Sequence, residues 1–296
     1  MKPLKIIWIL AILGLIGLFA WRWTRPPPIR PDRPTPSGPH EGRISALGPS
    51  VSGDVFGRIV QWQGDAVAST WIAHDGALRA LLWEQGDLVS VGADRVARWG
   101  PDGALKARFR LPEQGLNDGV LVPGGVAVAG IRGTVAVLEE AQPRWQARGV
   151  HGTAATAVWF DGTHLYSGGA DGRVLSWDVA TGIQQGACRF DLGVIIALIG
   201  DERGVLVVAR HGLARCRESE GSVLATWTWR PTSVARWGTY LAIGTEDGVV
   251  DLRNPLTGKE IQTIDTGEAV LAVWLDAAGL TTGGRGDGQR RRWPLP

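Results

Sequence analysis

The sequence predicts an all-β protein, a seven-bladed β-propeller of four-stranded antiparallel blades, preceded by one N-terminal transmembrane helix. Three observations support this fold class: a seven-fold repeat over residues 42–293, glycine-containing turns between short β-rich runs, and an uncharged apolar run near the N-terminus. Apolar residues make up 44% and charged residues 20% of the 296 residues, which is typical of a folded globular chain.

The N-terminal segment, residues 1–24, is expected to anchor the protein in a membrane. Residues Ile6–Ala20 are apolar and uncharged. With their apolar margins they approach the roughly 20 residues that cross a hydrocarbon core about 30 Å thick. A cleavable signal peptide is the alternative, although Leu18-Phe19-Ala20 is a poor cleavage site because cleavage requires small residues at alternate positions.

Charges on the two sides of the apolar run give conflicting indications of orientation. Lys2 and Lys5 precede the run, whereas four arginines follow it between residues 22 and 33. Because a cytoplasmic N-terminus is the commoner arrangement, we expect a single-pass protein of the inner (cytoplasmic) membrane with its propeller on the periplasmic, exported side. The proline-rich residues 25–41 predict an extended linker, and residues 42–296 form the propeller domain.

The repeat is clearest in the strand that closes each unit. One residue per unit falls in an equivalent column, at intervals of 37 to 40 residues: Trp62, Trp99, Leu138, Trp177, Cys216, Arg253 and Trp293. A second column lies upstream, near the ends of apolar runs: Leu47, Trp83, Val122, Trp159, Ile199, Trp237 and Trp274. Two columns with one period indicate a supersecondary unit that buries its apolar faces by stacking, so most tryptophans are expected between blades.

The fourth unit divides most clearly into four extended segments. These segments are Thr156–Phe160, Leu165–Gly169, Arg173–Trp177 and Ile183–Phe190. The connections are Asp161-Gly162, Asp171-Gly172 and Thr181-Gly182. Asp-Gly between extended runs is a strong hairpin signal because glycine accepts the positive φ that the turn requires. A meander of about 40 residues, repeated seven times, is the pattern of propeller blades.

This unit resembles the WD-repeat β-propeller family, here in a membrane-anchored, bacterial-type form. The segment Leu165–Asp178 carries the family's Ser/Thr, turn-Asp and Trp-Asp positions, and His151 lies close to the family's Gly-His site. The resemblance implies a buried structural relay whose members are His151, Ser167, Asp171 and Trp177.

The other units match the WD-repeat pattern less completely. Ser90, Asp94 and Trp99 fit with one turn residue missing, and His74 is the candidate histidine for that unit. In the sixth unit Arg253-Asn254 replaces Trp-Asp. Only three residues follow Trp293, so the last unit lacks an outer strand of its own. The resemblance implies that the chain around Ser37–Glu41 supplies it.

No residues occur at the spacing that catalysis or cofactor binding requires. The five histidines are not at metal-ligand spacing. They are assigned to a tail (His40), to inter-blade loops (His74, His151) and to hairpin turns (His164, His211). Phosphate-binding loops between a strand and a helix, and Gly-x-Ser-x-Gly motifs, are missing as well. We predict no catalytic, cofactor-binding or metal site, and we identify no small-molecule substrate.

Charge and cysteine usage set two further expectations. The net charge of +2 comes from basic residues in the first 40 positions, so the propeller is nearly neutral and is not expected to bind nucleic acid. Cys188 and Cys216 are interpreted as buried apolar positions. One disulfide between them stays open as an alternative if the propeller is exported.

Two groups of residues are candidates for an interaction surface. Arg290, Arg291 and Arg292 form a basic cluster that suits either a solvated edge or contact with anionic lipid or an acidic partner. Four tryptophans lie outside both columns, in outer segments where alternation leaves one side exposed: Trp71, Trp145, Trp227 and Trp229. Exposed aromatic side chains are frequent binding hot spots.

The expected function is that of a membrane-tethered, non-catalytic scaffold or assembly factor for protein partners of a membrane or envelope complex. The expectation rests on the propeller fold and the tether. The alternative is an exported propeller enzyme or small-ligand binder, whose site would need convergent polar groups at the mouth of the central channel.

Overall fold

Every regular element in the part of the chain that the structure describes is a β-strand. The computed structural model describes residues 39–296 apart from residues 112–114, 140–141, 202 and 285–287. The predicted membrane anchor and all but the last three residues of the predicted linker lie outside the described residues. Within those residues, no helix has the length and apolar character needed to cross a bilayer.

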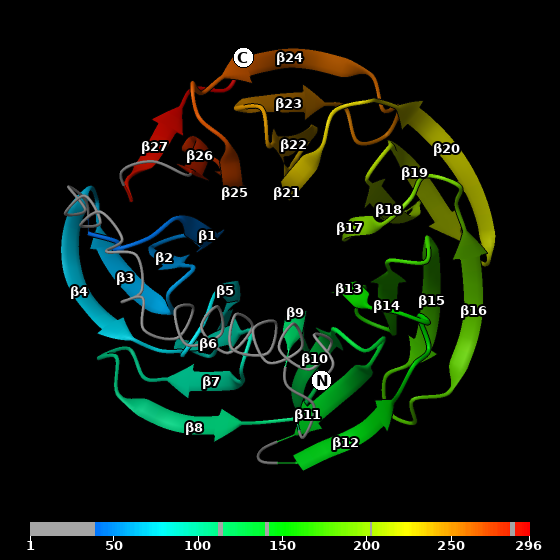
Figure 1. Ribbon diagram of the computed structural model, residues 1–296, viewed down its shortest axis with the longest axis horizontal. Coiled ribbons are helices and arrows are strands. Elements are labelled where there is room, and N and C mark those ends of the chain that lie inside the picture. The colour runs from blue at the N-terminus through cyan, green and yellow to red at the C-terminus, as the bar shows by residue number, and fades with distance from the viewer. Residues whose placement is uncertain (1–38, 112–114, 140–141, 202, 285–287) are drawn as a thin grey trace, which may run out of the picture. The chain divides into compact units, whose positions relative to one another are not determined.

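The strands form seven antiparallel sheets around a central axis (Figure 1). The inner strands are β1 Ile44–Leu47, β5 Leu78–Glu84, β9 Leu116–Val122, β13 Ala155–Phe160, β17 Ile195–Asp201, β21 Pro231–Trp237 and β25 Val270–Asp276. The second strands are β2 Val51–Asp54, β6 Asp87–Gly92, β10 Gly125–Gly130, β14 His164–Gly169, β18 Gly204–Ala209, β22 Tyr240–Thr245 and β26 Gly279–Gly284.

Third and fourth strands complete each sheet toward the rim of the ring. The third strands are β3 Arg58–Gln63, β7 Val96–Trp99, β11 Val135–Glu139, β15 Arg173–Asp178, β19 Gly212–Arg217, β23 Val249–Arg253 and β27 Arg290–Trp293. The outer strands are β4 Ala66–Ile72, β8 Leu105–Phe109, β12 Gln142–Ala147, β16 Gln184–Arg189, β20 Glu220–Thr226 and β24 Glu260–Asp265.

Each inner strand contacts the inner strand of the next sheet, and β25 contacts β1, which closes the ring. The predicted seven-bladed β-propeller is therefore confirmed. In the described residues the seventh blade has three strands, β25–β27, as expected from the short C-terminal tail. Pro39, His40 and Glu41 lie in no strand, so these three residues do not supply the missing outer strand; Ser37 and Gly38 lie outside the described residues.

The fourth blade shows how the sequence sets the turns. Its strands β13–β16 begin and end within two residues of the predicted segments. Gly162, Gly172 and Gly182 occupy the connecting turns with φ of 101°, 74° and 72°. Residues with a Cβ rarely adopt this left-handed backbone region, because the Cβ crowds the following carbonyl oxygen. Glycine has no Cβ and is therefore favoured in these turns.

The column of closing residues is also confirmed, because all seven residues lie on third strands. Trp99 pairs with Leu88, Trp177 with Leu165, and Trp293 with Leu280, at one shared register.

The second column is less regular than predicted. Its residues lie on the inner strands, but at different registers: Trp159 pairs with the third residue of the second strand, whereas Trp237 pairs with the first. A shift of two residues keeps the side chain on the same face, but it moves Trp237 to the last residue of β21, beside the turn. Trp237 is 43% exposed and is not the core residue that the column predicted.

The apolar core is divided among the interfaces between adjacent blades. One cluster, for example, joins Leu165 and Trp177 of the fourth blade to Val137 of the third, all less than 3% exposed. Full burial of a leucine side chain contributes about 2 kcal/mol. A single blade exposes both faces of its sheet, so the blades become stable only when they stack side by side.

Candidate functional site

Three blades each contain a buried cluster of hydrogen-bonded tryptophan, serine, histidine and aspartate side chains. In the second blade, Trp99 Nε1 donates a hydrogen bond to Ser90 Oγ (2.8 Å). His74 Nε2 lies 2.8 Å from the same Ser90 oxygen, and His74 Nδ1 lies 2.7 Å from Asp94 Oδ1. All contacts are satisfied when Nδ1 donates to the carboxylate and Nε2 accepts from the hydroxyl. The cluster ties the inter-blade loop that carries His74 to β6 and β7.

The fourth blade repeats the arrangement with the four residues singled out by the sequence. Trp177 Nε1 donates to Ser167 Oγ (2.9 Å), and His151 Nε2 lies 2.8 Å from that oxygen. His151 Nδ1 lies 3.2 Å from Asp171 Oδ1. The structure thus brings all four residues together.

The first blade contains a third cluster that sequence reasoning missed. His40 Nε2 lies 2.6 Å from Ser52 Oγ, which accepts a hydrogen bond from Trp62 Nε1 (2.7 Å), and His40 Nδ1 lies 3.2 Å from Asp54 Oδ2. His40 is fully buried, so its assignment to an unstructured tail was wrong. The available signal was the ten-residue step from Ser52 to Trp62, which matches the step from Ser167 to Trp177 in the fourth blade.

Burial and hydrogen bonding shift the pKa values of the histidine and aspartate side chains in the second and fourth blades. Burial lowers the pKa of His74 and of His151, although the adjacent carboxylates act in the opposite direction. Burial would raise the pKa of Asp94, but the hydrogen bond and charge of His74, with further contacts, hold it below its ordinary value. The pKa of Asp171 is lowered in the same manner by Arg173 and His151. Neutral histidine beside charged aspartate is therefore the favoured state near neutral pH.

The Asp–His–Ser arrangement resembles a nucleophilic triad in composition only. Ser90 and Ser167 are fully buried, and each hydroxyl oxygen already accepts an indole N–H. A nucleophile must reach its substrate, and these hydroxyls are enclosed within a blade. The clusters can therefore hold loops and strands in place, but their serines have no access to a reacting group.

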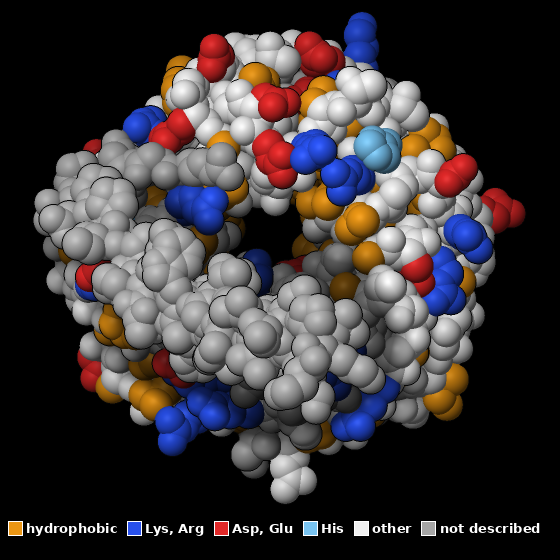
Figure 2. All heavy atoms as spheres, viewed as in Figure 1, with side chains coloured by type: hydrophobic (Ala, Val, Ile, Leu, Met, Phe, Trp, Pro, Cys, Tyr) orange, Lys and Arg blue, Asp and Glu red, His pale blue; other side chains and the backbone are white. Residues whose placement is uncertain are grey.

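The central channel forms a cavity with a volume of about 780 Å³. All seven inner strands contribute to its wall, and Figure 2 shows the ring hollow at its centre. Arginines from the first, second and sixth blades, Arg43, Arg79 and Arg236, lie among mostly apolar and hydroxyl side chains. Among the described residues no group of three metal-ligating side chains converges here or elsewhere.

Polar side chains of the channel wall connect adjacent blades. At one shared position of four inner strands, a hydroxyl or amide donates a hydrogen bond to a backbone carbonyl of the next blade. The donor–acceptor pairs are Ser45–Leu78, Asn117–Ala155, Thr156–Ile195 and Thr232–Val270. Polar residues in the channel therefore align the blades.

Asp118 makes a further inter-blade contact in the channel wall. Its carboxylate accepts hydrogen bonds from the backbone N–H of Gly119 (2.8 Å) and of Val158 in the next blade (3.0 Å). Burial raises the pKa of Asp118 to about 7, although both hydrogen bonds act in the opposite direction. This carboxyl group is the most strongly shifted acid in the channel, and its contacts are structural.

The predicted interaction tryptophans lie at blade interfaces. Trp71 on β4 lies 5.9 Å from Trp99 of the next blade, and Trp145 on β12 stacks at 6.0 Å on Trp177 of the next blade. Trp227 and Trp229 stack on each other at 4.3 Å. Trp227 is only 8% exposed, so the exposure expected for it was wrong, whereas the other three are half-buried.

The arginines of β27 differ in their surroundings. The Arg290 guanidinium lies 4.1 Å from the ring centroid of Trp62 in the first blade, and its side chain is 7% exposed. Arg291 pairs with Glu268, whereas Arg292 is half exposed and lies 3.9 Å from Asp65. Arg290 therefore joins the seventh blade to the first, and only Arg291 and Arg292 extend toward solvent.

Comparisons with known proteins show the fold alone. No protein-family model and no curated protein matches the sequence. Among solved structures, the β-propeller domain of Cps50 (Swd1) from Myceliophteria thermophila has a TM-score of 0.74 at 18% identity, and the match covers 87% of this chain and 98% of that one. The computationally designed Ika8 protein has a TM-score of 0.65 at 19% identity, covering 86% and 97%. The chain shares its propeller architecture with these structures.

A disulfide joins Cys188 on β16 of the fourth blade to Cys216 on β19 of the fifth. Both residues are buried, as the sequence suggested, and of the two alternatives left open the structure shows the bonded one. Cys216 occupies the closing column that holds tryptophan in four other blades. The disulfide thus takes the place of an aromatic contact between neighbouring blades.

Proposed function

We propose that the protein is a membrane-tethered, non-catalytic scaffold or assembly factor of the WD-repeat kind, which holds protein partners in a membrane or envelope complex. The observation that carries the proposal is the structural use of its polar clusters. His74, Ser90 and Asp94, which have the composition of a catalytic triad, are engaged with Trp99 inside a blade. Because these polar groups are used to hold the blades together, the function is assigned to the surface of the ring. Extended surfaces of repeat proteins suit protein binding.

The WD-repeat assignment is supported by the three Trp–Ser–His–Asp clusters. Each cluster connects the loop that enters a blade to the second and third strands of that blade, which is the structural role implied by the resemblance. The remaining blades substitute other contacts: in the sixth, Arg253 pairs with Asp251 at 2.8 Å. Divergent blades on a common ring would allow different partners to bind at different places.

An exported location on the periplasmic side is supported by the Cys188–Cys216 disulfide. Disulfides persist in oxidising compartments, whereas cytosolic thiols are kept reduced. The tether itself rests on the apolar, uncharged run Ile6–Ala20. Together these features favour a single-pass protein whose propeller stands outside the cytoplasmic membrane.

A ligand-binding role for the channel is the second candidate. The channel volume of about 780 Å³ lies within the range of small-molecule sites, and Arg43 and Arg79 bring positive charge to its wall. Binding of an anionic metabolite to purified protein that is lost in Arg79→Ala would favour this candidate.

The scaffold proposal is tested by affinity purification of the full chain from detergent after in vivo cross-linking. We expect the same few envelope proteins to be recovered in independent preparations and lost when the propeller is destabilised by Ser90→Ala. A C-terminal reporter fusion that is active only outside the cytoplasm would support the location. Repeated recovery of the protein alone would contradict the scaffold role.

A further inference from the structure

The wall of the central channel differs in chemical character between the two ends of the ring. Charged and polar side chains gather where the inner strands begin, and large apolar side chains gather where these strands end. Figure 2 shows Lys and Arg side chains together with hydrophobic ones around the central opening. The channel is therefore amphipathic along its axis.

Two arginines at the beginning of neighbouring inner strands carry uncompensated positive charge. Arg43 directly precedes β1, and Arg79 is the second residue of β5. Both side chains are exposed and line the channel. Among the described residues, neither guanidinium has an ion-pair or hydrogen-bond partner. Because β1 and β5 contact each other in the ring, both charges lie at the same mouth of the channel.

The two carboxylates among the described residues of the channel wall are engaged elsewhere. Glu246 forms an ion pair with Arg230 at 3.5 Å. The Asp118 carboxylate accepts hydrogen bonds from the backbone N–H groups of Gly119 and Val158. Burial raises the pKa of Asp118 to about 7, so this group carries only part of a negative charge near neutral pH. The mouth at Arg43 and Arg79 therefore remains positive.

Five large apolar side chains form a collar at the other end of the channel. Each pairs with the third residue of the second strand in its blade, so all five lie at one level of the ring. The apolar collar consists of Leu82, Val120, Trp159, Ile199 and Trp274. All five line the channel and are half-buried, so each leaves apolar surface that faces the cavity. Covering this surface with an apolar ligand is favourable.

Contacts with neighbouring groups hold the two tryptophans of the apolar collar in place. Trp274 Nε1 donates a hydrogen bond to Asp276 Oδ2 (3.1 Å). The Trp159 ring lies against Gly200 of the next blade, where an added Cβ would be 2.2 Å from Trp159 Nε1. Arg236, the one cation at this end of the channel wall among the described residues, donates from Nη1 to the Gly200 carbonyl (3.0 Å). The apolar collar is thus a fixed surface.

The spacing between the mouth and the apolar collar matches a medium-length alkyl chain. Arg79 and Leu82 are three residues apart on β5, which corresponds to about 10 Å along a strand. The channel volume of about 780 Å³ is large enough for such a chain together with an anionic head group.

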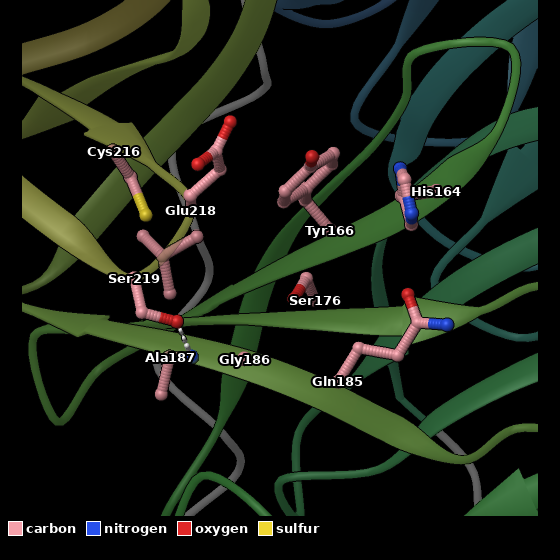
Figure 3. A pocket seen from close by; sticks show the side chains of 10 residues that line it. His164, Tyr166, Ser176, Gln185, Gly186, Ala187, Cys216, Glu218 and Ser219 are labelled. Atoms are coloured by element: carbon pink, nitrogen blue, oxygen red, sulfur yellow. Dashed lines mark hydrogen bonds between the residues drawn. The ribbon is translucent and has the colours of Figure 1, made fainter.

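A second cavity shows that this combination is specific to the channel. It has a volume of about 300 Å³ and lies between the fourth and fifth blades (Figure 3). None of the described residues that line it is a lysine or an arginine. Ser219 Oγ accepts a hydrogen bond from the Ala187 N–H (3.2 Å) across its border. This cavity therefore offers no cation to an anionic ligand.

We propose that the central channel binds a long-chain carboxylate, whose head contacts Arg43 and Arg79 and whose alkyl chain lies against the apolar collar. The proposal rests on the ligand-binding role of the channel, the second candidate function, and names the class of its ligand. Guanidinium groups bind carboxylates through paired, charge-assisted hydrogen bonds. Each methylene that is buried against the apolar collar removes apolar surface from water, so affinity should rise with chain length.

The site is tested by fluorine NMR with the full chain in phosphatidylcholine nanodiscs and ω-trifluorodecanoate as the probe. Empty nanodiscs give the signal of probe dissolved in lipid. We expect an additional, saturable resonance from the bound probe, with a dissociation constant on the order of 0.1 mM. ω-Trifluorobutanoate has the same head but a chain too short to reach the apolar collar, so we expect it to bind at least tenfold more weakly.

Substitution of the two arginines tests the position of the head. Arg43→Gln and Arg79→Gln should each weaken binding of ω-trifluorodecanoate about tenfold. Arg132→Gln is the matched control, because Arg132 is also exposed and without an ion pair but lies outside the channel wall, in the turn after β10. Circular dichroism and thermal unfolding verify that the variants are folded. Equal affinity in the wild type and in both channel variants would overturn the proposal.

Substitution in the apolar collar tests the position of the chain. Trp274→Leu keeps an apolar side chain but removes the ring current, so the resonance of the bound trifluoromethyl group should shift while the affinity changes less than threefold. Trp229→Leu, outside the channel wall, is the control and should leave the resonance unchanged. A bound resonance that is unaffected by both Trp274→Leu and Trp159→Leu would overturn the proposal, because the chain would then not reach the apolar collar.

The two probes separate this inference from the candidate function on which it rests. Equal binding of ω-trifluorobutanoate and ω-trifluorodecanoate, lost for both in Arg79→Gln, would reject the long-chain ligand and leave an anion-binding channel standing. The absence of a saturable resonance for either probe would reject the inference and the second candidate function together. Recovery of protein partners tests the scaffold function independently of both probes.

Discussion

Cys188 and Cys216 form a covalent bond between two neighbouring blades, at the interface where a tryptophan pair is replaced by small residues. The two cysteines are 28 residues apart in the sequence, so the bond closes a loop of about that length. It holds the fourth and fifth blades together within a buried apolar cluster that also contains Val174 and Val207. The interface therefore combines a covalent link with apolar packing.

Removal of the disulfide should destabilise the propeller. A disulfide that closes a loop of this size stabilises the folded protein by about 3–4 kcal/mol, because it restricts the unfolded chain. The double variant Cys188→Ala with Cys216→Ala should therefore lower the free energy of unfolding by up to that amount. Denaturant unfolding of wild type with and without reductant gives the measurement. The double variant is the control, because reductant should not change its free energy of unfolding. If reductant also left the free energy of unfolding of the wild type unchanged, the result would contradict the disulfide.

Removal of a buried relay hydroxyl should lower the free energy of unfolding more than removal of a surface hydroxyl does. Ser90→Ala leaves the Trp99 indole N–H and His74 Nε2 without their shared partner in a buried site, which costs about 1–3 kcal/mol for each group. We expect a decrease of at least about 2 kcal/mol in the free energy of unfolding. Ser222→Ala on the exposed face of β20 should change it by less than about 0.5 kcal/mol. Equal effects would show that the relay is not needed for stability.

Acidification should weaken the relays through their histidines. Burial lowers the folded-state pKa of His74, so the unfolded chain binds a proton first as the pH falls below 6.5. The stabilising contribution is therefore complete above pH 6.5 and is lost between 6.5 and the lower folded pKa. Below 3.8, protonation of carboxylates such as Asp94, whose folded pKa is lowered, removes a further part.

The pH effect is isolated by comparing wild type with His74→Asn. Asp118, with its pKa raised to about 7, contributes in the opposite direction between pH 3.8 and 7, and it is common to both proteins. The difference in free energy of unfolding between the two proteins should shrink from pH 8 to pH 5. A difference that stays constant or grows would show that His74 is not held neutral.

The contact of Arg290 with Trp62 should stabilise the seam between the seventh and first blades. A partly desolvated cation over an aromatic ring contributes about 1–2 kcal/mol, so Arg290→Ala should lower the free energy of unfolding by about that amount. Arg292→Ala is the control, because Arg292 is 51% exposed and lies 3.9 Å from Asp65. Effects of the same size in both variants would contradict the seam contact.

The column of one closing residue per unit, which is tryptophan in four of the seven units, predicted the blade number, because each of these residues lies on a third strand. The relay at Ser167 and Trp177 could also be anticipated, since its members occupy positions of the WD-repeat pattern that the fourth unit resembles. His40 was missed because it lies 12 residues before Ser52, whereas His151 lies 16 residues before Ser167. Spacing identifies such a cluster only when the loop length is conserved among blades.

The sequence alone determined the repeating strand pattern, because alternation of side chains and glycine turns act within about 40 residues. Tertiary structure decided which residues meet across blades: the bond between Cys188 and Cys216, the stacking of Arg290 on Trp62, and the hydrogen bond from the Ala187 N–H to Ser219. Each joins side chains from different repeats whose proximity depends on the ring's curvature and register. Local chain preferences contain no information on such contacts, so only the assembled ring fixes them.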